Sequence, residues 1–181
     1  MKNRLFFLSA LFFLSISLSG CGYTTHSLLP AHIKKIHIAN FKNSINITQE
    51  STDRNIYKTY RARLELDITK AIIDKFIMDG NLKISSAEDA DLVLTGELLD
   101  FDREPLRYDE ADNVQQYRMV LLVSVTLKDV AQNKIMWQFG SFAGSHDYYT
   151  FGSQSQSDDS AVNDAMDDLA RRIVEQTIEI W

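Results

Sequence analysis

The sequence has one cysteine, Cys21, two prolines and seven glycines among its 181 residues. A single thiol cannot form an internal disulfide, so the stability of the chain must come from packing. Basic residues are also in deficit, because 19 lysines and arginines stand against 25 aspartates and glutamates, a net charge of −6. A nucleic-acid-binding protein needs a basic surface, so this balance argues against nucleic acid as a partner.

Long apolar runs are absent except at the start of the chain. Leu5–Leu18 follows the cations Lys2 and Arg4 and is shorter than the roughly 20 residues that span a bilayer. A short apolar run behind a cationic start is typical of a signal peptide, here residues 1–20. Two other interpretations stay open: a signal anchor that remains in the membrane, and a plain signal peptide followed by a chance cysteine.

Leu18-Ser19-Gly20-Cys21 closes this run and resembles the lipobox of bacterial lipoprotein precursors. The resemblance implies cleavage before Cys21, diacylation of its thiol with chains such as palmitate, and acylation of the new amino terminus. More than one acyl chain gives stable anchoring, since each buried methylene adds about 0.8 kcal/mol. Gly22 stands where an aspartate, by resemblance to enterobacterial lipoproteins, would favour inner-membrane retention, so we expect the outer membrane.

Removing residues 1–20 leaves 17 basic and 25 acidic residues, a net charge of −8. The remaining chain is long enough for one domain with its own core. We expect residues 21–32 to form a lipidated tether and residues 33–181 to form the domain. Within the domain, Ile33–Phe41 alternates as a strand does, and the polar stretch Lys42–Asp53 predicts a loop.

A helix is predicted over Arg54–Met78, where apolar residues recur about every four positions. Asp53 is the expected N-cap, and Gly80 is the expected end because glycine tolerates the left-handed conformation. The charged face of this helix is expected to be solvated. The apolar stripe comprises Ile56, Tyr60, Leu64, Ile68, Ile72, Ile73, Phe76 and Ile77.

The second half of the chain shows strand-like alternation interrupted by turn residues. Gly140 and Gly144 predict a bulge or a bend in the last strand. The predicted segments are, in order, the strand Ala90–Phe101, the polar loop Asp102–Val114, the strand Gln116–Val130, the turn Ala131–Lys134, the strand Ile135–Phe139, the polar loop Thr150–Ser157 and the helix Asp159–Ile180.

The order strand, helix, three strands, helix predicts an α+β fold. We expect a single two-layer domain with a largely antiparallel sheet of about four strands and two helices packed on one face. In the hairpin strand, Ile135, Trp137 and Phe139 are expected to share the core-facing side. In the last helix, acid-first spacing predicts the ion pairs Asp167–Arg171 and Asp168–Arg172.

No set of catalytic residues emerges. Ser145-His146-Asp147 contains the residue types of a hydrolase triad, but neighbours on a strand point to opposite faces, whereas a relay needs converging side chains. His26, His32 and His37 lack metal-ligand spacing, and the acidic run Asp109-Glu110-Asp112 lacks the pattern of a calcium-binding loop. We therefore predict no catalytic residue, no metal site and no cofactor, and we expect that the chain is not an enzyme.

Three stretches together resemble the LptE family of lipopolysaccharide-assembly lipoproteins. They are Leu18-Ser19-Gly20-Cys21-Gly22-Tyr23, a first strand ending in Ala39-Asn40-Phe41, and Ala90-Asp91-Leu92-Val93-Leu94-Thr95-Gly96-Glu97-Leu98. The resemblance covers nearly the whole mature chain. It implies a periplasm-facing outer-membrane lipoprotein that seats in or against an LptD-like β-barrel and assists lipopolysaccharide insertion.

The resemblance also implies contact with lipopolysaccharide itself. Lipid A phosphates favour cations, which makes the basic residues near strand ends the candidate contacts, although any one such residue is more often an ordinary solubilising charge. These candidates are Arg103, Arg107, Arg118, Lys128 and Lys134. An alternative function remains open, because small α/β domains also occur in envelope lipoproteins that regulate a cell-wall synthase or form part of a secretion pore. A lipoprotein hydrolase is disfavoured by the missing nucleophile–base pair.

Overall fold

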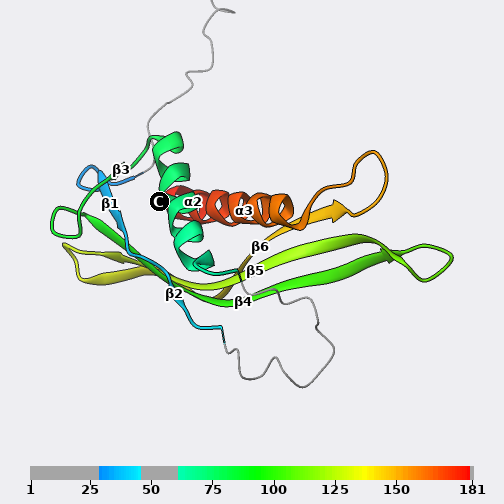
Figure 1. The fold of residues 1–181 in the computed structure, drawn as a ribbon. Helices are drawn as coiled ribbons and strands as arrows, with labels where there is room; N and C mark the ends of the chain where they lie inside the picture. The colour runs from blue at the N-terminus through cyan, green and yellow to red at the C-terminus, as the bar shows by residue number, and fades with distance from the viewer. Residues whose placement is uncertain (1–28, 46–60, 180–181) are drawn as a thin grey trace, which may run out of the picture.

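The computed structural model of the chain describes residues 29–45 and 61–179 (Figure 1). Cys21, Asp53 and the first part of the predicted helix therefore lie outside the described residues. The elements are β1 (Lys35–Ile38), β2 (Lys42–Asn43), α2 (Leu64–Asp79), β3 (Lys83–Ile84), β4 (Leu92–Tyr108), β5 (Val114–Asp129), β6 (Lys134–Tyr149) and α3 (Asp158–Glu179).

The described strands form a six-stranded sheet in the order β3-β1-β4-β5-β6, with β2 also paired to β4. β4, β5 and β6 are antiparallel, whereas β1, β2 and β3 make parallel pairs. The two helices cover one face of the sheet (Figure 1). The predicted α+β two-layer domain is confirmed. The sheet is mixed and larger than the expected four strands, because the two-residue strands β2 and β3 are too short to show a period.

The core lies between the helices and the inner face of the sheet. On β5 the residues of one parity, from Met119 to Leu127, are buried, as the alternation predicts. They meet the buried leucines of β4, such as Leu94 opposite Leu127. On α3, Val162, Met166, Leu169, Ile173 and Val174 are buried as expected.

The predicted polar loop Asp102–Val114 is wrong. β4 continues to Tyr108 and β5 begins at Val114, so only a short turn remains. The register shifts between Leu98 and Asp100, and this bulge changes which side chains face the core, so the alternation breaks while the strand goes on.

Pro105 fits into the extended β4 because the backbone N–H groups on its side of the strand do not donate to a neighbouring strand. The N–H of Arg103 donates to the carboxylate of Asp102 at 2.7 Å, and the N–H of Phe101 donates to Asp100 at 2.8 Å. Pro105 has the same parity and lies opposite Tyr117. A proline in this strand therefore signals an edge rather than a loop.

The β5–β6 hairpin is confirmed, but Ile135 does not face the core. The register shifts between Leu127 and Lys128, which places Ile135 opposite Lys128 and leaves it 53% exposed, while Trp137 is buried. A second shift, between Val123 and Val125, falls at Gly140 and agrees with the predicted bulge. Both irregularities come from strand pairing, which a single strand's pattern does not reveal.

α2 begins at Leu64 rather than at Arg54. Arg63, immediately before it, has a left-handed φ of 68°, which is incompatible with a helix running through this point. The predicted end is confirmed, because Gly80 has φ 77° and its N–H donates to the carbonyl of Phe76. Ile68 and Ile72 are buried as predicted, but Ile77 is exposed.

The first predicted strand, Ile33–Phe41, is present as β1 over Lys35–Ile38. The short β2 falls in the stretch Lys42–Asp53 that the sequence predicted as a loop, so the loop prediction is wrong at Lys42–Asn43, and residues 46–53 lie outside the described residues. Between β1 and β2, Phe41 is buried, and its N–H donates to the hydroxyl of Thr69 on α2. A Cβ at Gly96 would come within 2.2 Å of the Phe41 ring, so this glycine makes room for the aromatic side chain. None of the described helices is long and apolar enough to cross a membrane.

The predicted polar loop Thr150–Ser157 connects β6 to α3, and Gln156 in its second half packs against β6. The N–H of Gln156 donates to the carbonyl of Tyr149, and the side chain of Gln156 lies 3.1 Å from the ring of His146.

In α3, other ion pairs replace the predicted pairs Asp167–Arg171 and Asp168–Arg172. Asp167 pairs with Lys75 of α2 at 2.6 Å, and Arg171 pairs with Asp168 and Glu175.

Candidate functional site

The five basic residues proposed from the sequence fall at two opposite ends of the sheet. Arg103, Arg107 and Arg118 lie on the outer half of the β4–β5 hairpin, which extends past the helices (Figure 1). Lys128 and Lys134 lie at the other end, around the β5–β6 turn. Ten residues of β5 separate Arg118 from Lys128, which is about 33 Å along a strand. The five side chains therefore do not make one anion site.

Arg103 lies on the helix-facing side of the sheet because of the bulge in β4. Its guanidinium carbon is 3.6 Å from the ring centroid of Tyr117. Its Nε donates to the hydroxyl of Tyr148 at 2.7 Å, and its Nη2 is 3.3 Å from the carboxylate of Asp158 at the start of α3. We call Arg103, Tyr117, Tyr148 and Asp158 the arginine–tyrosine cluster. It joins three strands to the helix layer.

Tyr148 is the central member of the arginine–tyrosine cluster. Its hydroxyl accepts from Arg103 and donates to Asp158 at 2.6 Å. Burial, followed by the hydrogen bond to Asp158, raises the pKa of Tyr148 far above that of a solvated tyrosine. The phenol therefore stays protonated over the physiological pH range and acts as a hydrogen-bond bridge.

Arg118 lies on the opposite, outer face of the sheet. It makes two hydrogen bonds to Asp147 of β6, at 2.6 and 2.8 Å. These hydrogen bonds are the main cause of the lowered pKa of Asp147. A phosphate that binds Arg103 or Arg118 must compete with a carboxylate already in place, whereas Arg107 is exposed near the hairpin tip.

The register of β6 separates the three triad residue types. His146 lies opposite Met119 on the inner face, while Asp147 lies opposite Arg118 on the outer face. Ser145 uses its N–H to donate to Asp168 of α3. The expected divergence of these side chains is confirmed, and the arrangement provides no nucleophile–base pair.

The acidic run at the hairpin tip has a structural role in the turn. The carboxylate of Asp109 accepts from the N–H groups of Ala111 and Asn113 at 2.8 and 2.9 Å. The hydrogen bonds from Asn113 are the first cause of the lowered pKa of Asp109. This carboxylate holds the turn closed, as Asx turns do.

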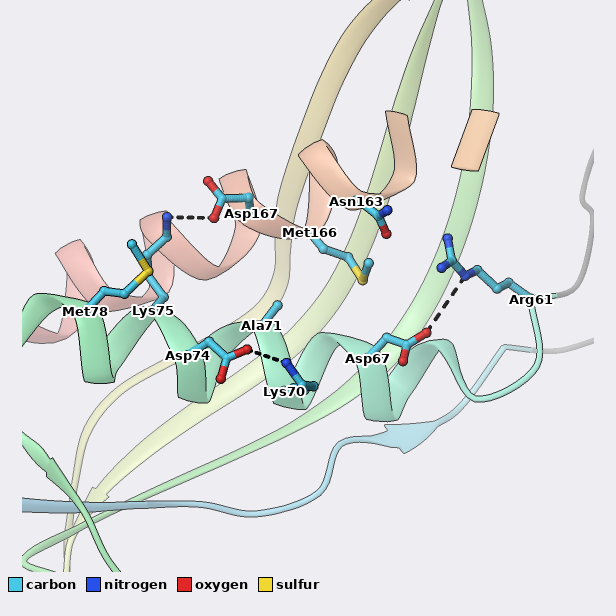
Figure 2. A pocket seen from close by; sticks show the side chains of 10 residues that line it. All are labelled: Arg61, Asp67, Lys70, Ala71, Asp74, Lys75, Met78, Asn163, Met166 and Asp167. Atoms are coloured by element: carbon cyan, nitrogen blue, oxygen red, sulfur yellow. Dashed lines mark hydrogen bonds and ion pairs between the residues drawn. The ribbon is translucent and has the colours of Figure 1, made fainter. Parts of the chain in front are cut away.

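A groove of about 360 Å³ lies between α2 and α3, and Figure 2 shows its lining. Its cations already have acidic neighbours: Arg61 is 3.8 Å from Asp67, and Lys70 is 2.6 Å from Asp74. Lys75 of α2 reaches Asp167 of α3. The lining holds three cations and three carboxylates, so the groove has no excess of one charge and selects no charged ligand.

The sequence analysis did not predict the groove or the arginine–tyrosine cluster. The groove uses the charged face of α2 that was expected to be solvated. The arginine–tyrosine cluster requires knowledge of the β4 bulge, although Tyr117 and Tyr148 share the buried parity of their strands and offered a signal.

The comparisons with known proteins concern the domain as a whole. The model of the LptE family, described as lipopolysaccharide-assembly, matches residues 33–177. The chain belongs to the LptE family. The matched residues run from just before β1 almost to the end of α3, and they include the arginine–tyrosine cluster and the groove. LptE is a family of assembly factors rather than of enzymes.

Solved structures are similar to this LptE-family chain over most of its length. Protein XCC0632 from Xanthomonas campestris is 10% identical, with a TM-score of 0.57 over 86% of this chain and 90% of that chain. The rare lipoprotein B from Shewanella oneidensis is 16% identical, with a TM-score of 0.45 over 80% and 93%. Lipoprotein B from Nitrosomonas europaea is 13% identical, with a TM-score of 0.46 over 82% and 86%. No curated protein matches the chain.

Proposed function

We propose that this LptE-family protein is an outer-membrane lipoprotein, anchored through Cys21 and facing the periplasm, that assists lipopolysaccharide assembly as the partner of an LptD-like β-barrel. The family match over residues 33–177 carries the proposal. The lipobox-like stretch ending at Cys21 supports the anchoring, and Gly22 after the cysteine supports the outer membrane.

The form of the domain supports a barrel partner. The lumen of a membrane barrel is polar, so a domain that sits in it needs a polar surface. The outer half of the β4–β5 hairpin supplies one, since Glu104, Arg107 and Glu110 are all exposed there. This surface is a strand pair rather than the long loop expected from the sequence, and a strand pair can keep its polar groups in fixed positions.

Direct contact with lipopolysaccharide is proposed at the same hairpin. Arg107 is the strongest candidate among the five basic residues, because its side chain is exposed and guanidinium groups bind phosphate with paired hydrogen bonds. Arg103 and Arg118 would contribute only after exchanging their partners Asp158 and Asp147.

Co-purification tests the proposal. Detergent-solubilised wild-type protein should bring down an LptD-like barrel, and depletion of the protein should lower surface lipopolysaccharide. The control is a Lys70→Ala variant, which changes an exposed lysine of α2 and should behave as wild type. Recovery of only peptidoglycan synthases or a secretion pore, with unchanged surface lipopolysaccharide after depletion, would replace this proposal with a regulatory or pore-forming role.

A further inference from the structure

The β5–β6 turn is held against the beginning of the described chain. His32 Nε2 lies 3.5 Å from Oδ2 of Asp129, the last residue of β5. Val130, the next residue, uses its N–H to donate to the carbonyl of Asp91, just before β4. Asp91 in turn accepts from the N–H groups of Lys34 and Lys35 at 2.8 and 2.9 Å. These contacts fix the turn beside the segment that leads back to Cys21.

The outward surface of this turn combines cations with apolar side chains. Lys128 and Lys134 are exposed, and so are Val130 and Ile135, at 46% and 53%. The one acid between Lys128 and Ile135 is Asp129, which is buried and accepts from the N–H of Gln132 at 2.8 Å. The turn therefore presents positive charge and branched apolar groups, although the mature chain is acidic overall.

The position of the turn ties it to the predicted lipid anchor. His32 follows Cys21 by 11 residues, and a chain of that length reaches at most about 40 Å. Acyl chains on Cys21 would therefore keep His32, and the turn that it contacts, within about 40 Å of the leaflet surface. Lysines attract anionic headgroups, and branched apolar side chains favour the boundary between headgroups and acyl chains.

We propose that the β5–β6 turn is a membrane-contacting surface that rests on the phospholipid leaflet holding the anchor. Val130 and Ile135 enter the interfacial region, and Lys128 and Lys134 lie over anionic headgroups. The proposal rests on the proposed acylation of Cys21 and deepens it, because it gives the anchored domain an orientation on the leaflet when it is outside its barrel partner: the β5–β6 end of the sheet faces the leaflet.

The opposite end of the sheet provides a matched control. Leu106 and Tyr108, near the tip of the β4–β5 hairpin, are 40% and 54% exposed. Their exposure is similar to that of Val130 and Ile135. Fourteen residues of β5, or about 46 Å of strand, separate the two ends, and Figure 1 shows them at opposite sides of the molecule.

The test uses single-cysteine variants of the full chain, purified from membranes as the lipoprotein. Acylation occupies the thiol of Cys21, so a fluorophore attaches only at Val130→Cys, Ile135→Cys, Leu106→Cys or Tyr108→Cys. Each protein is placed in phosphatidylethanolamine–phosphatidylglycerol vesicles with a nitroxide on the lipid headgroup. Quenching at residues 130 and 135 should be several-fold greater than at residues 106 and 108.

Charge reversal adds a second readout. Lys128→Glu with Lys134→Glu should reduce quenching at residue 135, whereas Arg107→Glu at the other end should leave it unchanged. Equal quenching at both ends, or stronger quenching at the hairpin tip, would overturn the proposal while mass spectrometry still finds acyl chains on Cys21. If mass spectrometry finds no acyl chains on Cys21 and none of the labelled positions is quenched, both the anchor and this orientation are wrong.

Discussion

At the scale of single residues, the position of Arg103 decides its role. A cation near a strand end is a reasonable phosphate ligand when only the sequence is known. The bulge before Asp100 turns Arg103 toward the helices, where it contacts Tyr117, Tyr148 and Asp158. Its first role is therefore to hold α3 on the sheet, and this role can be tested separately from lipid binding.

Tyr148→Phe removes the hydroxyl at the centre of the arginine–tyrosine cluster. Both Arg103 Nε and Asp158 lose a partner, so unfolding free energy should fall by about 1–3 kcal/mol. Urea unfolding at neutral pH measures this change. Tyr108→Phe is the control, because Tyr108 is exposed and its loss of a hydroxyl should change stability by less than about 0.5 kcal/mol. Equal losses in the two variants would contradict the bridging role.

The raised pKa of Tyr148 predicts a loss of stability in alkali. In the unfolded chain a tyrosine ionises near pH 10, whereas folded Tyr148 stays protonated at that pH. The unfolded state then binds fewer protons than the folded state, so stability is fully present below about pH 10 and falls above it. The stability gap between wild type and Tyr148→Phe should narrow from pH 8 to about pH 11. A constant gap across that range would show that the phenol is not shifted.

At the scale of elements, the contact between α3 and β6 depends on a glycine. A Cβ at Gly144 would lie 2.4 Å from Cβ of Leu169 and 2.7 Å from its backbone. Gly144→Ala should therefore push α3 away and cost about 1–3 kcal/mol. Gly140→Ala is the matched control on the same strand, since nothing lies within 4 Å of its Cβ position. Thermal unfolding of both variants separates the effect of the clash with α3 from the general effect of replacing a glycine on this strand.

The buried side of α2 can be tested with two isoleucines of the same helix. Ile68 is buried, whereas Ile77 is 62% exposed. Ile68→Asp would bury a carboxylate without a partner and should cost several kcal/mol, against a total stability of about 5–15 kcal/mol. Ile77→Asp should be nearly silent in the same denaturation experiment. A large loss for Ile77→Asp would place this residue in the core, as the sequence pattern alone had predicted.

At the scale of the whole molecule, the proposed membrane attachment depends on one thiol. Cys21→Ala removes the acyl acceptor, so the variant should retain residues 1–20 or appear as soluble periplasmic protein without acyl label. Palmitate labelling and membrane fractionation measure this. Ser27→Ala, in the same predicted tether, should be processed as wild type. Membrane-bound protein of mature size, with no acyl label on wild type, would end the lipoprotein interpretation.

Much of the architecture was predictable because it depends on local periodicity. Alternation along β5 and the four-residue spacing on α3 identify their buried faces, since each pattern reports on one element at a time. Gly80 ends α2 for an equally local reason, the left-handed conformation that glycine permits. The LptE family could also be identified, because its motifs are stretches of sequence.

Tertiary structure decided whatever depends on pairing between distant segments. Three features follow from strand register: the bulges opposite Val123 and Leu127, the parallel pairing of β1 with β4, and the exposure of Ile135. Register joins residues far apart in the chain, and a single-residue shift moves side chains to the other face. The same pairing places Lys128 and Lys134 some 33 Å or more from Arg118. The sequence therefore determined which residues are apolar or charged, and only the folded sheet determined which of them share a surface.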